Sequence, residues 1–195
     1  KLAWTGMRKN WKLYGPYFLT CIACAAMHYI ISFLHQMPAL QQIRAGRVLV
    51  PILAFGTGVV GFFSLIFLFY TSAFLIRRRK KEFGLYHILG MGKRNLIRIF
   101  FWENAILYGI TMLLGLLIGT ALSKLAELWL LHIIKNDVNY DFSVSFGAML
   151  QTAVLFGVIF ILLFLNGLRQ ISRASGIELL RSEQVGERKP KANWG

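Results

Sequence analysis

Three side chains near the start of the chain have the types and spacing of metal ligands. Cys21, Cys24 and His28 lie at positions i, i+3 and i+7, along one side of a helix. A structural zinc site needs four such ligands, and these two cysteines are the only ones in the sequence, with no histidine cluster nearby. The pattern therefore predicts helix packing, and we expect no metal site.

Glu103 is the one acidic residue within a long apolar segment. Ionisable residues in such segments are rare and commonly functional, so a proton or ion role is one interpretation. Glu103 also lies about one turn from the end of its segment, near Arg98, where a carboxylate can reach the headgroup region or form an ion pair. A structural anchor is the interpretation that we favour.

The sequence contains no recognisable motif for nucleotide binding or for hydrolysis. The stretch Gly90-Met91-Gly92-Lys93-Arg94 contains a Gly-Lys pair, but it lacks the upstream glycine and the following Ser or Thr of a phosphate-binding loop. No Ser-His-Asp set or carboxylate pair falls in one place. We expect a non-catalytic chain without a cofactor of its own, so that any ATP and Mg²⁺ would bind another polypeptide.

The composition places these residues in a membrane protein. The 195 residues are 56% hydrophobic and 15% charged, and the mean hydropathy is +0.57. Four apolar blocks each exceed the ~20 residues that cross a bilayer, namely Leu13–Leu34, Val48–Ile76, Ile99–Ser123 and Phe142–Leu168. The predicted fold is all-α, a four-helix transmembrane domain over residues 16–170 with spans at about 16–34, 48–76, 99–123 and 142–168.

Positive charge predicts the orientation of these spans. The net charge is +14, and 18 of the 22 Lys and Arg residues fall in residues 1–16, 77–98 and 169–195. Cytoplasmic segments carry this excess, so both termini are expected in the cytoplasm. The same clustering indicates attraction to anionic headgroups of the lipid bilayer and argues against nucleic acid as a partner.

The two terminal segments differ from the spans. Residues 1–15 predict an interfacial amphipathic helix, since Trp4, Met7 and Trp11 fall on one side, and Gly15-Pro16 is expected to break it. Residues 171–195 are polar and basic, and we interpret them as a cytoplasmic linker to an absent C-terminal part.

A short cytoplasmic coupling helix is predicted between the second and third spans. The basic cluster Arg77–Lys81 is expected to end the second helix, and Gly90 and Gly92 to end the short one. From the residues alone, this segment is either a positively charged loop or a docking surface for a cytoplasmic partner. The predicted coupling hairpin comprises Glu82, Phe83, Gly84, Leu85, Tyr86, Ile88, Leu89, Gly90 and Gly92.

Small residues recur every four positions in the third span. This stripe consists of Thr111, Gly115, Gly119 and Ser123. Small side chains let helix backbones approach closely, so packing within the subunit is expected, with a dimer or moving seam as the alternative. Gly56, Gly58 and Gly61 of the second span allow the same two interpretations.

The stretch from Leu75 to Ser123 resembles the signature of the FtsX-like permease family, the membrane subunits of one class of ATP-binding cassette (ABC) systems. The resemblance rests on a basic cluster, an acid-aliphatic-Gly-Leu run, a glycine turn, an acid in the next helix and a glycine spacing: Arg77–Lys81, Glu82–Leu85, Leu89–Arg94, Glu103 and Gly115–Gly119. The first 18 residues and the tail are similar to the bacitracin-export (BceB-like) branch.

This resemblance implies a bacterial plasma-membrane permease driven by a cytoplasmic ATPase dimer that docks on the coupling hairpin. It implies peptide antibiotics or their lipid-linked targets as the substrate class, a role in resistance, and a sensor histidine kinase as a further partner. The resemblance also implies ten helices in all, with a large extracellular domain later in the chain. The alternatives are a scaffold that binds a sensor kinase or cell-wall machinery without transport, and other FtsX-like branches (lipoprotein release, cell division, macrolide efflux).

Overall fold

The computed structural model describes residues 11–38, 40, 46–88, 93–134 and 145–173. Within these ranges the chain forms four long helices, α2 (Trp11–His35), α4 (Gly46–Ile88), α5 (Lys93–Ile134) and α6 (Phe146–Arg173). The described ranges contain no strand, and the prediction of an all-α fold is confirmed. The predictions for residues 1–10 and 174–195 fall outside these ranges.

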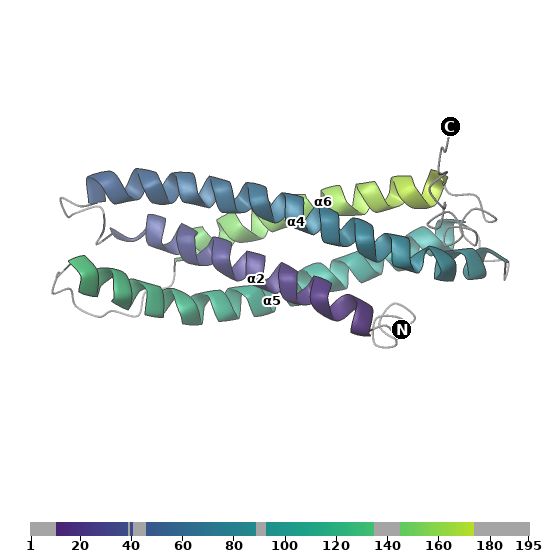
Figure 1. Cartoon of the computed structure of the whole chain (residues 1–195), viewed down its shortest axis with the longest axis horizontal. Coiled ribbons are helices and arrows are strands. Elements are labelled where there is room, and N and C mark those ends of the chain that lie inside the picture. The colour runs from purple at the N-terminus through teal and green to yellow at the C-terminus, as the bar shows by residue number, and fades with distance from the viewer. Residues whose placement is uncertain (1–10, 39, 41–45, 89–92, 135–144, 174–195) are drawn as a thin grey trace, which may run out of the picture.

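The four helices lie lengthwise against one another (Figure 1). α2 and α5 run in one direction, and α4 and α6 run in the other. As a result, the start of α2, the end of α4, the start of α5 and the end of α6 all lie at one end of the bundle. We call this the basic end, because the described cations Lys12, Arg77, Arg78, Arg94, Arg98 and Arg169 lie there.

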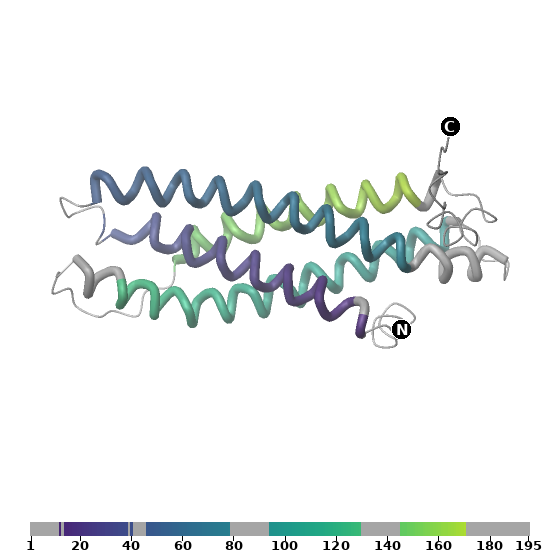
Figure 2. The backbone as a smooth tube through the Cα atoms, in the orientation of Figure 1, coloured from purple at the N-terminus to yellow at the C-terminus, as the bar shows by residue number. Residues whose placement is uncertain are grey.

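α2 lies at the centre of the bundle. It contacts each of the other three helices, α5 and α4 most extensively, and its tube passes between those two in Figure 2. Small side chains on α2 allow this approach, since Cys21 and Ala25 are fully buried. They join the main core cluster with Leu68 of α4 and with Phe156 and Leu163 of α6. The core therefore runs along α2.

All four helices are long and apolar enough to cross a membrane, as predicted. The apolar spans are Tyr14–His35, Gly46–Arg78, Arg94–Trp129 and Phe146–Gln170. The chain is accordingly a multi-pass membrane protein. The helices of the second and third spans are much longer than expected, at 43 residues for α4 and 42 for α5. At ~1.5 Å per residue each measures about 64 Å, twice the ~30 Å of the hydrocarbon core.

The basic cluster does not end the second helix. α4 continues through Arg77–Lys81 to Ile88, so the expected separate coupling helix is the last part of α4. The physical reason is that Arg and Lys are unfavourable inside a membrane but are good helix formers. The cluster ends the apolar span at Arg78, and the helix itself passes beyond it.

Gly15-Pro16 does not end a helix either. α2 begins at Trp11 and includes Pro16. Proline removes one backbone hydrogen bond, and near a helix start that loss falls on a carbonyl that other groups can satisfy. The Thr20 hydroxyl donates to the Pro16 carbonyl at 2.8 Å, an ordinary bond to the preceding turn. Residues 11–15, which we expected to belong to a separate interfacial helix, are therefore part of the same helix as the first span.

Candidate functional site

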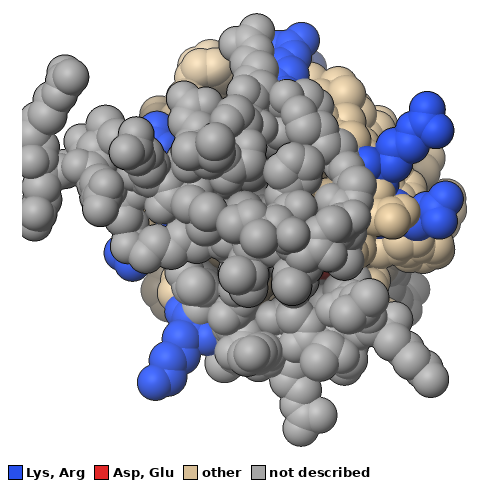
Figure 3. Space-filling view, turned by 90° about the vertical axis from the view of Figure 1, so that its right-hand side faces the viewer, with Lys and Arg blue, Asp and Glu red and all other residues tan. Residues whose placement is uncertain are grey.

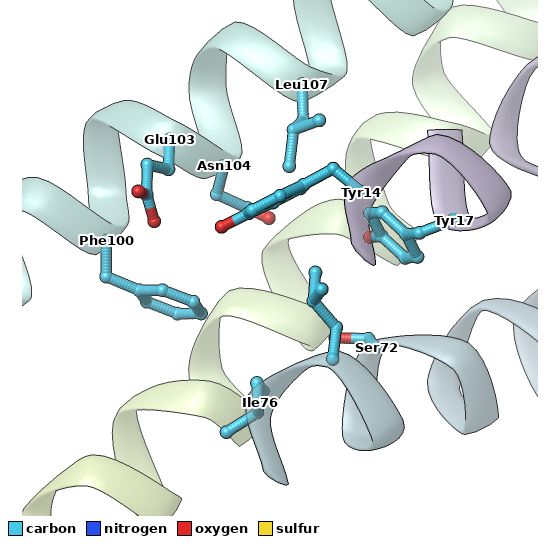
Figure 4. Close-up of a pocket in the computed structure, with 9 residues that line it drawn as sticks. Tyr14, Tyr17, Ser72, Ile76, Phe100, Glu103, Asn104 and Leu107 are labelled. Carbon is cyan, nitrogen blue, oxygen red and sulfur yellow. The ribbon is translucent and has the colours of Figure 1, made fainter. Parts of the chain in front are cut away.

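A small cavity with both polar and apolar lining residues lies between α2, α4 and α5 at the basic end of the bundle (Figure 4). Its volume of about 20 Å³ is enough for one water molecule. The lining residues come from all three helices and are Tyr14, Tyr17, Ser72, Leu75, Ile76, Phe100, Glu103, Asn104 and Leu107. Five of these residues are polar and four are apolar, namely Leu75, Ile76, Phe100 and Leu107.

Glu103 faces this cavity and not the headgroup region. Its side chain is 2% exposed, whereas Arg98 of the same helix is exposed. The two residues are five positions apart, which is about 140° around a helix, so they point to different faces. The interpretation in which the Glu103 carboxylate reaches the headgroup region is therefore wrong, because the side chain is buried.

Tyr14 of α2 and Asn104 of α5 lie beside this carboxylate. In Figure 4 the hydroxyl end of Tyr14 points toward Glu103 and Asn104. The Asn104 amide also donates to the Phe160 carbonyl of α6 at 3.1 Å. A buried acid in a membrane span is costly unless polar groups surround it, and here they come from α2 and from α5 itself. The arrangement can hold α2, α5 and α6 together at the basic end.

Two further hydrogen bonds tie α6 to its neighbours deeper in the bundle. His28 Nδ1 of α2 and Thr152 Oγ1 of α6 are 3.0 Å apart, and both residues are buried. The Tyr108 hydroxyl of α5 donates to the Ala153 carbonyl of α6 at 2.9 Å. Since few groups can replace such bonds within a membrane, they fix the position of α6 along α2 and α5.

Cys21 and His28, two of the three residues with the spacing of metal ligands, make different contacts. Cys21 lies in the apolar core, and His28 is hydrogen bonded to Thr152 and packs edge-on against Phe156. In the described part of the chain, no group of three or more His, Cys, Asp or Glu side chains is placed to hold a metal ion. These residues lie between helices.

The small-residue stripe of α5 lies against α2. Thr111, Gly115, Gly119 and Ser123 are all buried. A Cβ on Gly115 would lie 2.8 Å from Ala25 Cβ, and one on Gly119 would lie 2.9 Å from Tyr29 Cδ1. Within the subunit, α2 therefore occupies this face of α5.

The glycines of α4 are not equivalent. A Cβ on Gly61 would come within 3.1 Å of the Leu155 side chain of α6, whereas Gly58 has nothing within 4 Å and Gly56 has ordinary contact distances. Of these three residues, Gly61 is the one at a close helix–helix contact.

The predicted coupling hairpin falls partly within α4. Residues 82–88 form its final two turns, and α5 begins again at Lys93. Leu89, Gly90 and Gly92 lie outside the described residues. The described part of the predicted hairpin, residues 82–88, is thus the extension of a membrane-crossing helix.

Sequence reasoning missed the partners of Glu103 and a polar contact at the opposite end. There the Gln36 amide donates to Gln151 Oε1 at 2.9 Å, and the Ser145 hydroxyl donates to Gln36 Oε1 at 3.0 Å. Ser145 Oγ also accepts the Ala148 amide, as a helix N-cap does. The cap was recognisable from Ser145 before an apolar run, but its contact with α2 was not.

The chain is similar to known membrane permeases. Residues 54–176, more than half of it, match the family described as FtsX-like permease C-terminal. It is 28% identical over 187 residues (95% of this chain, 29% of the relative) to the bacitracin export permease protein BceB of Bacillus subtilis (strain 168). It is 30% identical over 159 residues (82% of this chain, 24% of the relative) to the protein of the same name from Halalkalibacterium halodurans.

A third relative is the ABC transporter permease YvcS of Bacillus subtilis, 25% identical over 185 residues, or 94% of this chain and 28% of the relative. The chain therefore spans less than a third of the length of the curated relatives that it matches.

Proposed function

Because the chain belongs to the FtsX-like permease family, we propose that it is the part of an ABC transporter permease that couples a cytoplasmic ATPase to change across the membrane. ATP and Mg²⁺ would bind the ATPase, a dimer of a separate polypeptide. Both ends of this segment would face the cytoplasm of a bacterial cell, in agreement with the six described cations at the basic end.

The observation that carries this proposal is the continuity of α4. One helix runs from Gly46 through the basic cluster to Ile88, about 64 Å at ~1.5 Å per residue. A force on its final turns would act on the whole rod, because a continuous helix has no joint to absorb it. The residues proposed to receive that force are the apolar members of the coupling hairpin: Phe83, Leu85, Tyr86, Ile88 and Leu89.

The packing of the other helices supports the same mechanism. α2 and α5 approach closely at Gly115 and Gly119, where an added Cβ would lie less than 3 Å from α2 side chains. α4 contacts α2 extensively but contacts α5 far less. In our proposal α2 and α5 move as one unit, and α4 is the lever that moves against it.

The substrate class that we propose is peptide antibiotics of the bacitracin type, or their lipid-linked targets, with resistance as the outcome. Support comes from the two relatives that are named as bacitracin export permeases. Recognition of the peptide would require parts of the permease that this segment does not include.

Copurification of the ATPase tests the docking step. We expect Leu85→Asp combined with Leu89→Asp to reduce the ATPase recovered with the permease at least tenfold. Asn95→Asp is the matched control, because it adds a negative charge at an exposed position near the start of α5 without removing an apolar side chain. Undiminished recovery with the double variant would contradict the proposal.

One observation favours a second function, a scaffold that binds a sensor kinase without transport. The cavity described above has room for about one water molecule, so it offers no path for a peptide. ATPase turnover in reconstituted vesicles, with and without peptide, separates the two functions. Turnover that does not respond to peptide, together with retained kinase binding, would favour the scaffold.

A further inference from the structure

Exposed cations surround the basic end of the bundle. Each of the four helices contributes at least one exposed side chain to this set, which we call the basic collar: Lys12, Arg77, Arg78, Arg94, Arg98 and Arg169. Figure 3 looks onto this end and shows Lys and Arg side chains spaced around its rim. The charge is therefore distributed around the circumference and is not concentrated on one face.

No exposed acid among the described side chains neutralises the basic collar. The acids whose side chains are described are Glu103, which is buried in the cavity, and Glu127, which lies near the opposite end. At that opposite end the balance differs, because Lys124 forms an ion pair with Glu127 at 2.8 Å. Among the described side chains, several exposed cations without a neighbouring acid occur together only at the basic end.

Three collar arginines, one each on α4, α5 and α6, lie one turn outward from an exposed apolar side chain. Arg78 follows Phe74, which is 51% exposed, and its guanidinium lies over that ring at 5.2 Å from the centroid. On α5, which runs in the opposite direction, Arg98 precedes Trp102, which is 58% exposed.

The α6 helix repeats this order, with Leu165, 46% exposed, one turn deeper than Arg169. On three helices that run in both directions, an apolar residue thus lies deeper and a basic residue follows ~6 Å farther out along the helix axis.

We propose that the basic collar binds the headgroups of anionic phospholipids, so that these lipids accumulate around the basic end and not around the opposite end. The paired apolar and cationic groups match a molecule with acyl chains and a phosphate at one end. Free phosphate would use only the cations. A protein partner would approach one side or the end, which does not account for cations around the whole circumference.

Two tryptophans allow a test within one molecule. Trp102 is one turn from Arg98, and Trp129, 76% exposed, lies at the opposite end of the same helix. Two versions of the full chain would be prepared. One keeps Trp102 as its single tryptophan and the other keeps Trp129, with every other tryptophan replaced by Phe. Each protein would be reconstituted in phosphatidylcholine vesicles that contain brominated phosphatidylglycerol or brominated phosphatidylcholine, and fluorescence quenching would give the relative lipid affinity.

We expect phosphatidylglycerol to be preferred about fivefold at Trp102, the effect of one nearby cation, and to show no preference at Trp129. Arg94→Gln with Arg98→Gln should remove most of the preference at Trp102. Arg47→Gln, at the opposite end, should leave it unchanged. About 1 M salt should weaken it in the unaltered protein, since the charges are exposed.

Equal preference at both tryptophans would overturn the proposal, as would a preference that survives the double Arg substitution. If the collar instead binds the ATPase, Trp102 shows no lipid preference and the double variant loses ATPase copurification. That result also overturns it. Quenching of Trp129 by brominated phosphatidylcholine reports whether the double variant is folded and inserted. The measurement uses neither ATPase nor nucleotide, so its outcome is independent of the coupling function.

Discussion

Gly115 of α5 lies against Ala25 of α2 with no space for a side chain between them. A Cβ at Gly115 would be 2.8 Å from Ala25 Cβ and 3.5 Å from the Ile22 carbonyl oxygen. Neither neighbour is the flexible end of a long side chain, so a larger residue can be accommodated only if the helices separate. This contact is why we treat α2 and α5 as one mechanical unit.

Gly115→Ala should therefore destabilise the protein by about 1–3 kcal/mol, the usual cost of overpacking a close contact. Gly109→Ala is the matched control, because Gly109 lies on the same helix and has nothing within 4 Å. The measurement is unfolding in mixed detergent micelles. Equal stability of the two variants would show that α2 and α5 do not pack as described.

The stripe containing Gly115 could be identified from sequence, but its partner could not. A four-residue period of small side chains predicts a close helix contact, and it does not specify which helix approaches. The four spans were likewise predictable from hydropathy. The ends of α4 and α5 were not, because hydropathy records where the bilayer ends, and Arg77–Lys81 are compatible with a helix outside it.

The cavity around Glu103 shows the same limit. Glu103 itself is conspicuous as an acid in an apolar segment, and it was singled out. Tyr14 and Ser72 are ordinary residues in their own helices, and they join Glu103 only because α2 and α4 pack there. Proximity between helices depends on the register of packing, which a single sequence does not record.

Substitutions of Glu103 should separate its polar role from its charge. Glu103→Gln keeps the volume and one acceptor oxygen and replaces the other oxygen with an amide donor, so we expect stability to remain within about 1 kcal/mol of the unaltered protein. Glu103→Leu leaves the polar cavity groups facing an apolar side chain and should cost about 1–3 kcal/mol. Unfolding in mixed micelles measures both.

Peptide-dependent ATPase turnover in the reconstituted complex completes this test. A structural anchor predicts that the Gln variant retains turnover. Loss of turnover in a Gln variant of normal stability would instead assign the carboxylate a proton or ion role.

The bond between His28 and Thr152 should contribute a small and measurable coupling energy. We expect a double-mutant cycle with His28→Leu and Thr152→Val to give about 0.6 kcal/mol, the average for hydrogen bonds between membrane helices. Both residues are buried and their polar atoms are 3.0 Å apart. A cycle with Thr71→Val in place of Thr152→Val is the control, since the Thr71 hydroxyl donates to carbonyls of its own helix. Additive effects of the two substitutions at His28 and Thr152 would indicate that the bond does not form.

The orientation of the bundle can be tested with single cysteines at exposed cations of its two ends. We expect Arg47→Cys to react with a membrane-impermeant maleimide on intact cells, and Lys12→Cys to react only after the cells are opened. Both native side chains are exposed, and the charge asymmetry places Lys12 on the cytoplasmic side. The native thiols give little background, because Cys21 is fully buried and Cys24 is half-buried within the first span. Labelling of Lys12→Cys on intact cells would show that the topology is the reverse of the predicted one. The final turns of α4 would then lie outside the cell, beyond the reach of a cytoplasmic ATPase.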